Sequence, residues 1–254
     1  MSAGATMATL GIIGGTGLDD LETLAGRREE RVDTPYGPPS APLVHGRLGG
    51  ARVVFLARHG AAHRLAPHEI NYRANLWALR DAGVGAVAAI AAVGGIAERP
   101  EPGGLVVPDQ LIDYTWGRAA TFFEGPRAAV EHVDFTWPYT PALRARLLEA
   151  AARAGVDARD GGCYGATQGP RLETAAEIRR LERDGCTLVG MTGMPEAALA
   201  RELGLDYACC AVVANRAAGT DGTAVATDAI PRHLAAGMER VRRLLEALAP
   251  VAGD

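Results

Sequence analysis

The chain has 254 residues, 48% of them hydrophobic and 22% charged, which fits one large α/β domain with a full core. A formal net charge of −4 argues against a surface that binds nucleic acid. Residues 1–6 do not resemble a signal peptide and no apolar run reaches membrane-spanning length, so we expect a cytoplasmic protein with no membrane partner.

Short apolar runs alternate with amphipathic segments along most of the chain. The apolar runs have the length of buried strands, and the amphipathic segments repeat their apolar residues at helical spacing. Gly83, Gly155 and Gly204 end helical patterns, while Thr140 and Pro141 open one as N-cap and first helical residue. In chain order, strands are predicted at 10–14, 52–57, 86–93, 105–111, 162–167, 187–191 and 207–214, and helices at 67–82, 142–154, 173–183, 195–203 and 230–248.

This alternation predicts an α/β fold in which helices cover a mostly parallel or mixed sheet. No internal repeat, low-complexity tract or interdomain linker interrupts the pattern. We therefore expect a single domain over residues 1–254, with residues 1–7 as a flexible leader. The proline-rich stretch 35–42 is expected to form a hairpin or a surface loop and not a hinge.

The cysteines and histidines lack the spacing of disulfide frameworks or metal sites. Cys163, Cys186, Cys209 and Cys210 contain no C-x-x-C pair, so we expect buried thiols in a reducing compartment. The six histidines form no H-E-x-x-H or similar helical pair, so no metal site is expected.

The first apolar run breaks into a glycine-rich loop, Gly14-Gly15-Thr16-Gly17. A strand that ends in clustered glycines can present backbone N–H groups to an anion such as phosphate. The spacing does not match G-x-G-x-x-G, and the chain has no lysine for a Walker motif, so neither a dinucleotide nor an NTP is indicated. A tight turn that requires glycine explains the same residues, and the loop alone leaves both interpretations open.

Polar residues also follow the other predicted strands. Ligands of α/β sheets bind beyond the carboxyl ends of the strands, so these residues are expected to meet in one crevice. Some carry groups that suit an anion, and others could read the edge of a heterocycle. No Ser/His/Asp triad or nucleophile elbow is evident, so covalent catalysis is not implied. The anion set is Thr16, Arg58, His59 and Thr192, and the heterocycle set is Glu173 and Asn215.

Seven segments with such strand-end motifs follow one another through nearly the whole chain. They are GIIGGTGLDD (11–20), ARHG with the following histidine (57–63), PHEINYRANLWAL (67–79), PGGLVVPDQLID (102–113), ATQGPRLET (166–174), VGMTGMPEAALARELGLDYA (189–208) and VVANRAAG (212–219).

Together these segments resemble the trimeric purine nucleoside phosphorylase and methylthioadenosine phosphorylase family, in that family's order. The resemblance implies an α/β fold with a central mixed sheet flanked by helices, and a homotrimer. It also implies phosphorolysis of purine nucleosides, with inorganic phosphate as co-substrate and no metal or organic cofactor.

The resemblance assigns roles to individual residues. The ribose diol contact falls on Met191, and His132 from a neighbouring subunit is expected at the 5′ end, beside apolar residues near 230–234. A threonine common in the family is replaced by Ala91, which is expected either to weaken phosphate binding or to leave backbone contacts only. The phosphate contacts fall on Thr16, Arg58, His59, Ala92 and Thr192, and the base contacts on Leu172, Glu173, Asn215 and Ala217.

Two base-pocket positions depart from the methylthioadenosine phosphorylases. Those enzymes carry Asp-x-Asp where this chain has Asn215-Arg216-Ala217, and usually a small residue at the position of Glu173. An amide can donate to a 6-oxo group and N7, and a carboxylate can accept from the base N1–H. Both positions therefore favour hypoxanthine over adenine, because mismatched buried groups would stay unpaired.

The RHG motif, the NYRANLWAL segment and His132 nevertheless lie nearer the methylthio branch. The combination resembles bacterial methylthioinosine phosphorylases and predicts 5′-methylthioinosine as substrate; inosine, guanosine and methylthioadenosine are the alternatives. In the expected mechanism, phosphate attacks C1′ of the ribose. The catalytic residues are expected to be Asn215, Glu173 and His59. A nucleosidase that uses water, or a nucleoside-binding protein without activity, is the rival interpretation.

Overall fold

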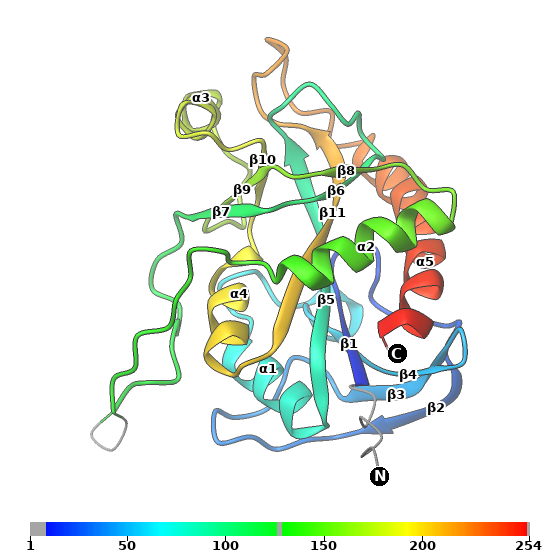
Figure 1. Ribbon diagram of the computed structural model, residues 1–254. Coiled ribbons are helices and arrows are strands. Elements are labelled where there is room, and N and C mark those ends of the chain that lie inside the picture. Colours follow the sequence, from blue (N-terminus) through cyan, green and yellow to red (C-terminus); the bar gives the residue numbers. More distant parts are fainter. Residues whose placement is uncertain (1–8, 126–128, 253–254) are drawn as a thin grey trace.

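The structure is a computed structural model that describes residues 9–125 and 129–252; the expected leader at residues 1–7 lies outside this range. A mixed sheet forms its centre, with helices on both faces, as the sequence predicts (Figure 1). The strands are β1 (Thr9–Gly14), β2 (Ala25–Glu30), β3 (Leu43–Leu48), β4 (Ala51–Ala57), β5 (Val84–Gly95), β6 (Leu105–Val107), β7 (Gln110–Asp113), β8 (Ala158–Asp160), β9 (Cys163–Ala166), β10 (Leu188–Gly190) and β11 (Asp206–Arg216).

Five α-helices are present in the described residues, together with one short 3-10 turn. Each α-helix overlaps a predicted one, although several boundaries differ. They are α1 (Tyr72–Asp81), α2 (Pro141–Arg153), α3 (Ala175–Arg183), α4 (Gly193–Glu202) and α5 (Ile230–Ala252), and the turn is η1 (Ala61–His63).

The order of the strands places four carboxyl ends at one edge of the sheet. The main path runs β2-β3-β4-β1-β5-β10-β9-β7, and β11, with β6 and β8 beyond it, branches from β5. β1 lies between β4 and β5 and is parallel to both, and β11 is parallel to β5. The loops that follow β1, β4, β5 and β11 therefore converge, which is the place where ligands bind in such sheets.

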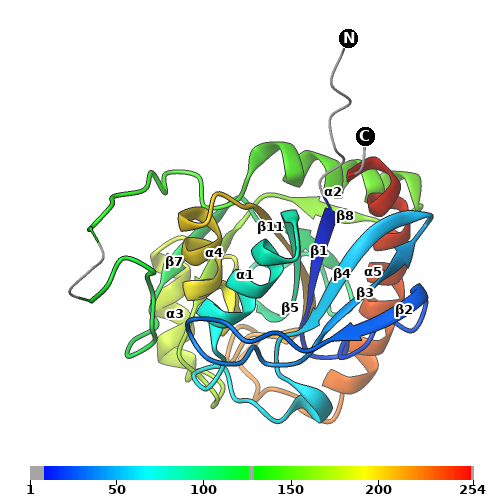
Figure 2. The same cartoon turned by 90° about the horizontal axis from the view of Figure 1, so that it is seen from below.

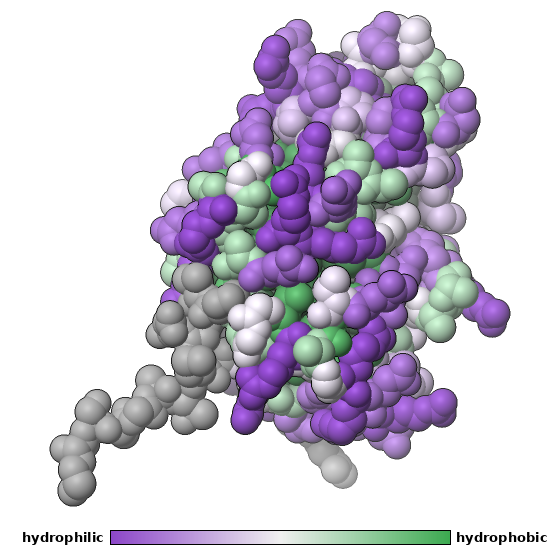
Figure 3. Space-filling model, turned by 90° about the vertical axis from the view of Figure 1, so that its right-hand side faces the viewer, coloured by the Kyte–Doolittle hydropathy of each residue, from purple (hydrophilic) through white to green (hydrophobic). Residues whose placement is uncertain are grey.

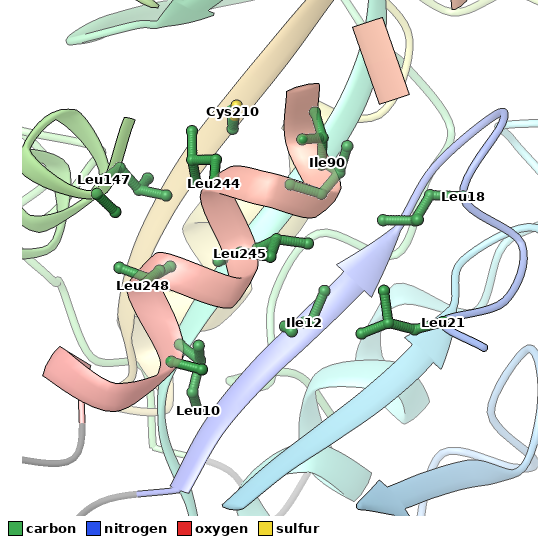
Figure 4. Packing of buried hydrophobic residues seen from close by; sticks show 14 of the residues in the cluster. Leu10, Ile12, Leu18, Leu21, Ile90, Leu147, Cys210, Leu244, Leu245 and Leu248 are labelled. Carbon is green, nitrogen blue, oxygen red and sulfur yellow. The ribbon is translucent and has the colours of Figure 1, made fainter. Parts of the chain in front are cut away.

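The two faces of the sheet are buried in two separate cores. Along β5, Ala88 and Ile90 enter the core under α2 and α5, whereas Val87 and Ala89 enter the core under α1 and α4. Figure 4 shows the first core, in which leucines of α5 pack towards β1, β5 and β11. Burial on both faces explains why β5 reads in the sequence as a continuous apolar run.

The strands β2, β3 and β8 are missing from the sequence prediction, and one predicted strand corresponds to two strands of the structure. β2 has an exposed, charged sequence, and β8 has three residues, so neither shows an apolar pattern. The predicted strand at 105–111 divides at Pro108 into β6, which pairs with β11 and β8, and β7, which pairs with β9. Proline has no N–H to donate to a ladder and therefore marks this break. The stretch 35–42 lies in the connection of the β2–β3 hairpin, as expected.

Helix boundaries differ from the prediction where side chains cap the backbone. α1 begins at Tyr72 and not near residue 67, because the Asn71 side chain accepts a hydrogen bond from the Ala74 N–H. α2 begins at Pro141 with Thr140 at the N-cap, as predicted. The Thr140 hydroxyl, however, accepts from the Tyr207 N–H on β11 and makes no capping bond.

The described residues between β7 and α2, 114–125 and 129–140, extend away from the body of the molecule in both ribbon views (Figures 1 and 2). It exposes Trp116 and Trp137, which are 72% and 56% exposed. By contrast, the α5 side of the molecule shows mostly hydrophilic side chains with scattered apolar ones (Figure 3). Within residues 9–125 and 129–252, no helix has both the length and the apolar character to cross a membrane.

Candidate active site

A cavity of about 460 Å³ opens where the carboxyl ends of β1, β4, β5, β10 and β11 meet. The structure brings together there every predicted site residue except Ala91 and His132, so the single crevice expected from the strand ends is present. The role of each residue in binding or catalysis stays a prediction. The predicted residues that line the cavity are Thr16, Arg58, His59, Ala92, Leu172, Glu173, Met191, Thr192, Asn215 and Ala217.

Ala91 and His132 lie elsewhere for different reasons. Ala91 is buried in the core under α1 and α4, while Ala92, the next residue of β5, lines the cavity. A side chain at position 91 therefore packs in the interior and does not line the cavity. His132 is exposed on the extended segment and does not line the cavity of its own chain, so its expected role in a neighbouring subunit stays a prediction.

The glycine-rich loop after β1 is both a required turn and a wall of the cavity. A Cβ atom on Gly15 would lie 2.4 Å from the Ile90 carbonyl oxygen, and Gly17 has a φ of +86°. Glycine is therefore needed at both positions. The Leu18 N–H donates to the Gly15 carbonyl at 2.9 Å and closes the turn, which leaves Gly15 and Thr16 facing the cavity.

Arg58, at the end of β4, is not a free guanidinium. Its Nε and Nη2 donate to the two carboxylate oxygens of Glu196 at 2.7 and 2.8 Å, and its Nη1 donates to the Ile90 carbonyl at 2.7 Å. The edge of the guanidinium formed by Nε and Nη2, which could have bound phosphate, is therefore occupied by the Glu196 carboxylate. Two of the five guanidinium N–H groups are left for a ligand.

The Arg58–Glu196 pair is buried at the back of the cavity. Arg58 is 1% exposed and Glu196 0% exposed, and Tyr207 on β11 donates its hydroxyl to Glu196 at 2.8 Å. Burial alone would lower the pKa of Arg58, but the Glu196 carboxylate outweighs burial and holds that pKa above its ordinary value. The positive charge that faces the cavity is thus fixed in place and already partly neutralised.

His59 is a neutral side chain beside this pair. Burial, with a further contribution from the Arg58 charge, lowers the pKa of His59 from 6.5 to about 4. Its Nδ1 lies 2.9 Å from the Leu65 carbonyl oxygen, which can only accept, so Nδ1 carries the proton. Nε2 consequently has a free lone pair and can accept a hydrogen bond from a hydroxyl group.

At the base end, Glu173 is held by a threonine. The Thr167 hydroxyl donates to Glu173 Oε1 at 2.6 Å, which leaves Oε2 without a partner from this bond. The helix predicted to begin at Glu173 begins at Ala175, with Thr174 as N-cap and Glu177 completing the capping box. Glu173 therefore precedes the helix, and helix-dipole stabilisation in a first turn does not explain its presence.

Asn215 lies in the last part of β11, next to a register shift in the pairing with β5. Its Nδ2 donates to the Arg216 carbonyl at 2.7 Å, and the residue is half-buried in the cavity wall. The amide can redirect its donors to a ligand by rotating about its side-chain bonds.

The middle of the cavity is shaped by Met191 and its support. A Cβ on Gly169 would lie 2.4 Å from the Met191 sulfur, so glycine at position 169 allows the thioether to pack there. Arg118, from the extended segment, donates to the carbonyl oxygens of Met191 and Gln168 at 2.8 and 2.9 Å. The apolar side chains of Val225, Ile230 and Leu234 also line the cavity.

Sequence reasoning missed Glu196 and Arg118. Glu196 had a signal, since it is the one charge in the apolar stretch Gly193–Ala200, and a charge in a buried helix face is normally paired. Arg118 had none, because its partners are backbone carbonyls. Among the described residues, no three His, Cys, Asp or Glu side chains are placed to hold a metal ion.

Comparison with known proteins identifies the family to which the chain belongs. Residues 9–250 match the model of the Phosphorylase superfamily. The chain belongs to this superfamily. The match covers nearly all of the described residues and therefore includes the whole cavity.

Several relatives in this superfamily are similar in sequence to the chain. It is 59% identical to a protein of Xanthomonas campestris pv. campestris over 83% of this chain and 84% of the relative, and 53% identical to one of Pseudomonas syringae pv. tomato over 94% and 97%; both are named probable S-methyl-5′-thioinosine phosphorylase. A 6-oxopurine nucleoside phosphorylase of Pyrococcus furiosus is 43% identical over 96% and 93%.

A solved structure gives the same fold. Methylthioadenosine phosphorylase from Schistosoma mansoni, in complex with tubercidin, superposes with a TM-score of 0.89 at 32% identity. The superposition covers 97% of this chain and 92% of that one.

Proposed function

We propose that this phosphorylase cleaves purine nucleosides with inorganic phosphate and releases a 6-oxopurine, with 5′-methylthioinosine as its substrate. The observation that carries the proposal is the cavity itself. One end holds Arg58, His59 and Thr192, the other holds Glu173 and Asn215, and an apolar 5′ end adjoins them. Inorganic phosphate is the co-substrate, and no metal or organic cofactor takes part in the proposed chemistry.

At the phosphate end, hydroxyl groups, backbone amides and the free N–H groups of Arg58 hold the anion below C1′ of the ribose. The glycosidic bond lengthens as phosphate approaches, and the sugar acquires oxocarbenium character. The phosphate anion then stabilises the positive sugar. Because Arg58 is fixed by Glu196, little reorganisation is needed in the transition state, which is how preorganised charges accelerate such reactions.

At the base end, two groups select a 6-oxopurine. Glu173 Oε2 accepts from the N1–H that hypoxanthine carries and adenine lacks. The Asn215 amide, rotated from the Arg216 carbonyl, donates to O6 and N7 and stabilises the negative charge that develops on the departing purine. Adenine has no N1–H, so it would leave Glu173 Oε2 without a donor, which lowers its reactivity.

The names of the relatives differ in the purine base of the nucleoside that they cleave, and the residues of this chain favour one of the two bases. One structural neighbour is a methylthioadenosine phosphorylase at 32% identity, whereas two relatives at 53% and 59% identity carry the thioinosine name. Both groups of names share the methylthio substituent, which suits an apolar end formed by Val225, Ile230 and Leu234. Glu173 and Asn215 favour the thioinosine assignment.

We also propose that the enzyme is a cytoplasmic homotrimer in which His132 of one subunit completes the 5′ end of its neighbour. The exposed Trp116 and Trp137 on the extended segment support burial of that segment against another copy. Light scattering on the purified chain tests this, since a trimer has three times the 26.4 kDa mass of the monomer. A monomeric mass would contradict it.

The function is tested by base release from methylthioinosine, methylthioadenosine, inosine and adenosine, each with and without phosphate. We expect turnover only with phosphate, formation of a sugar 1-phosphate, and the highest kcat/KM for methylthioinosine. Base release that is independent of phosphate would identify a nucleosidase. Inosine as the best substrate would contradict the apolar 5′ end, and methylthioadenosine as the best substrate would contradict the roles of Glu173 and Asn215.

A further inference from the structure

Three side chains form a chain of hydrogen bonds at the rim of the cavity. Thr16 Oγ1 lies 3.3 Å from His63 Nε2, and His63 Nδ1 lies 3.1 Å from Asp19 Oδ1. Thr16 and Asp19 belong to the loop after β1, and His63 belongs to the η1 turn after β4. The order hydroxyl, imidazole and carboxylate is the one that hydrolases use to remove a proton from a hydroxyl group.

The backbone places the His63 ring at this position in an uncommon conformation. His63 and Ala62 have φ values of 55° and 56°, in the left-handed region that residues other than glycine rarely adopt. The His63 N–H donates to the Gly60 carbonyl at 3.3 Å, and the Leu65 N–H donates to the His59 carbonyl at 3.0 Å. Such backbone strain is concentrated at functional sites, where the surrounding structure holds it.

The partners of His63 decide where its proton lies. A carboxylate only accepts, so Nδ1 carries the proton and donates to Asp19. Nε2 then has a lone pair, and the Thr16 hydroxyl donates to it. The lone pairs of Thr16 Oγ1 are left to accept, which suits an oxygen that carries a proton, such as the P–OH of hydrogen phosphate.

The neighbouring histidine cannot take over this role. The His59 ring stacks on the His63 ring with 4.2 Å between centroids, so two imidazolium charges would repel each other. Burial lowers the pKa of His59 to about 4, which disfavours a proton on that ring. The His63 side chain contacts Asp19 and is 36% exposed, so it has access to solvent, whereas His59 is 6% exposed.

We propose that Thr16, His63 and Asp19 form a relay that accepts the proton of hydrogen phosphate during phosphorolysis. The proposal rests on the proposed function, because it needs phosphate as the attacking group. His63 and Asp19 act on phosphate through Thr16, so they are positioning residues that also hold a proton.

The proton balance of the reaction provides the reason for such a relay. The substrate HPO₄²⁻ carries one proton, and the sugar 1-phosphate dianion carries none. As a phosphate oxygen forms its bond to C1′, the C1′–N9 bond breaks and its electron pair goes to the purine. The P–OH proton passes to Thr16 Oγ1 while the Thr16 proton passes to His63 Nε2. Solvent later takes this proton from His63 and supplies one to the purine.

The test compares His63→Ala with His68→Ala, a control at an exposed histidine of the same segment that does not line the cavity. We expect H63A to lose kcat by on the order of 10²-fold, with H68A unchanged within about twofold. Added imidazoles should restore H63A, and more basic imidazoles should restore it better. A residue that only supports the loop would not show this dependence on basicity.

A second arm tests whether His63 acts through Thr16. In the Thr16→Val background, H63A should cause less than about a twofold further loss, because the relay is already broken. Asp19→Asn removes the carboxylate at nearly constant shape and serves if H63A does not fold. We expect D19N to lower kcat by about tenfold or more, with the KM for phosphate within about threefold of wild type.

Each result decides the proposal. The relay would be overturned by full activity of H63A or D19N, by failure of imidazoles to restore H63A, or by an equal H63A effect with and without the Thr16 hydroxyl. In each of these cases, phosphate-dependent turnover by the wild-type enzyme would still support the proposed function. Absence of phosphate-dependent turnover in the wild type would overturn both.

Discussion

The two polar ends of the cavity are built in different ways. At the phosphate end, Arg58 and His59 are 1% and 6% exposed, and Arg58 is bonded to groups on α4 and β5. At the base end, Leu172 is 41% exposed, and Asn215 donates to the carbonyl of its own neighbour. The end that we propose to bind phosphate is thus held in the core, and the end that we propose to contact the base lies nearer the rim. Substitutions at the first end should alter stability, and those at the second should alter substrate choice.

The largest expected effect is at the phosphate end. Glu196→Ala leaves the Arg58 charge buried without a partner, so we expect a loss of about 3–5 kcal/mol in the free energy of unfolding. The matched control is Glu149→Ala, which breaks an exposed pair with Arg153 at 3.9 Å and should cost less than about 1 kcal/mol. Urea unfolding measures both, and equal losses would show that burial of the pair is unimportant.

Acid should lower the free energy of unfolding through His59, at the same end of the cavity. The pKa of His59 is about 4 in the folded protein and 6.5 when unperturbed, so the unfolded state binds the proton more readily. The contribution of His59 to stability is complete above pH 6.5 and is lost as the pH falls towards 4. The full loss is about 3 kcal/mol, from 1.36 kcal/mol per pKa unit.

The non-titrating His59→Asn variant isolates this contribution. Its free energy of unfolding should fall less steeply between pH 6.5 and pH 4 than that of the wild type. Parallel pH curves for the two proteins would show that His59 is not held neutral by the fold.

At the base end, the expected effect is on turnover. Asn215→Ala should lower kcat with methylthioinosine by on the order of 10²-fold, the effect of removing one preorganised donor. The control is Asn71→Ala, which removes the N-cap of α1 and should cost about 1 kcal/mol of stability with kcat unchanged. A loss below about threefold for N215A would contradict its role at the leaving group.

The smallest expected effect comes from the support of Glu173. Thr167→Val removes the hydroxyl that donates to Glu173 at 2.6 Å, a hydrogen bond worth about 0.5–1.5 kcal/mol. We therefore expect kcat/KM for methylthioinosine to fall by about 2- to 13-fold. Thr223→Val, whose hydroxyl bonds Asp221 on an exposed loop, should leave it unchanged. No difference between the two variants would show that Glu173 needs no support.

The sequence predicted the centre of the fold better than its edges. The runs that became β1, β4, β5 and β11 are buried on both faces and therefore apolar throughout. β2 lies at the edge of the sheet, where charged residues are tolerated, so its sequence carries no such signal. The β6–β7 break could have been predicted from Pro108.

The candidate site was predictable where residues follow strands directly. Thr16, Arg58, Thr192 and Asn215 were placed in one crevice by the rule for strand ends alone. The side-chain pairing within the crevice was not predictable. Glu196 is 138 positions from Arg58, and only the packing of α4 against the sheet reveals that it occupies the guanidinium fork.

The most direct test of this account is a competition between methylthioinosine and methylthioadenosine in one reaction with phosphate. The ratio of the two product rates gives the ratio of kcat/KM values without separate measurements. Because the Glu173 carboxylate can accept from the N1–H of a 6-oxopurine and adenine has no N1–H, we predict a preference for methylthioinosine of about 100-fold or more. Comparable rates, or a preference for methylthioadenosine, would contradict the assignment of base selection to Glu173 and Asn215.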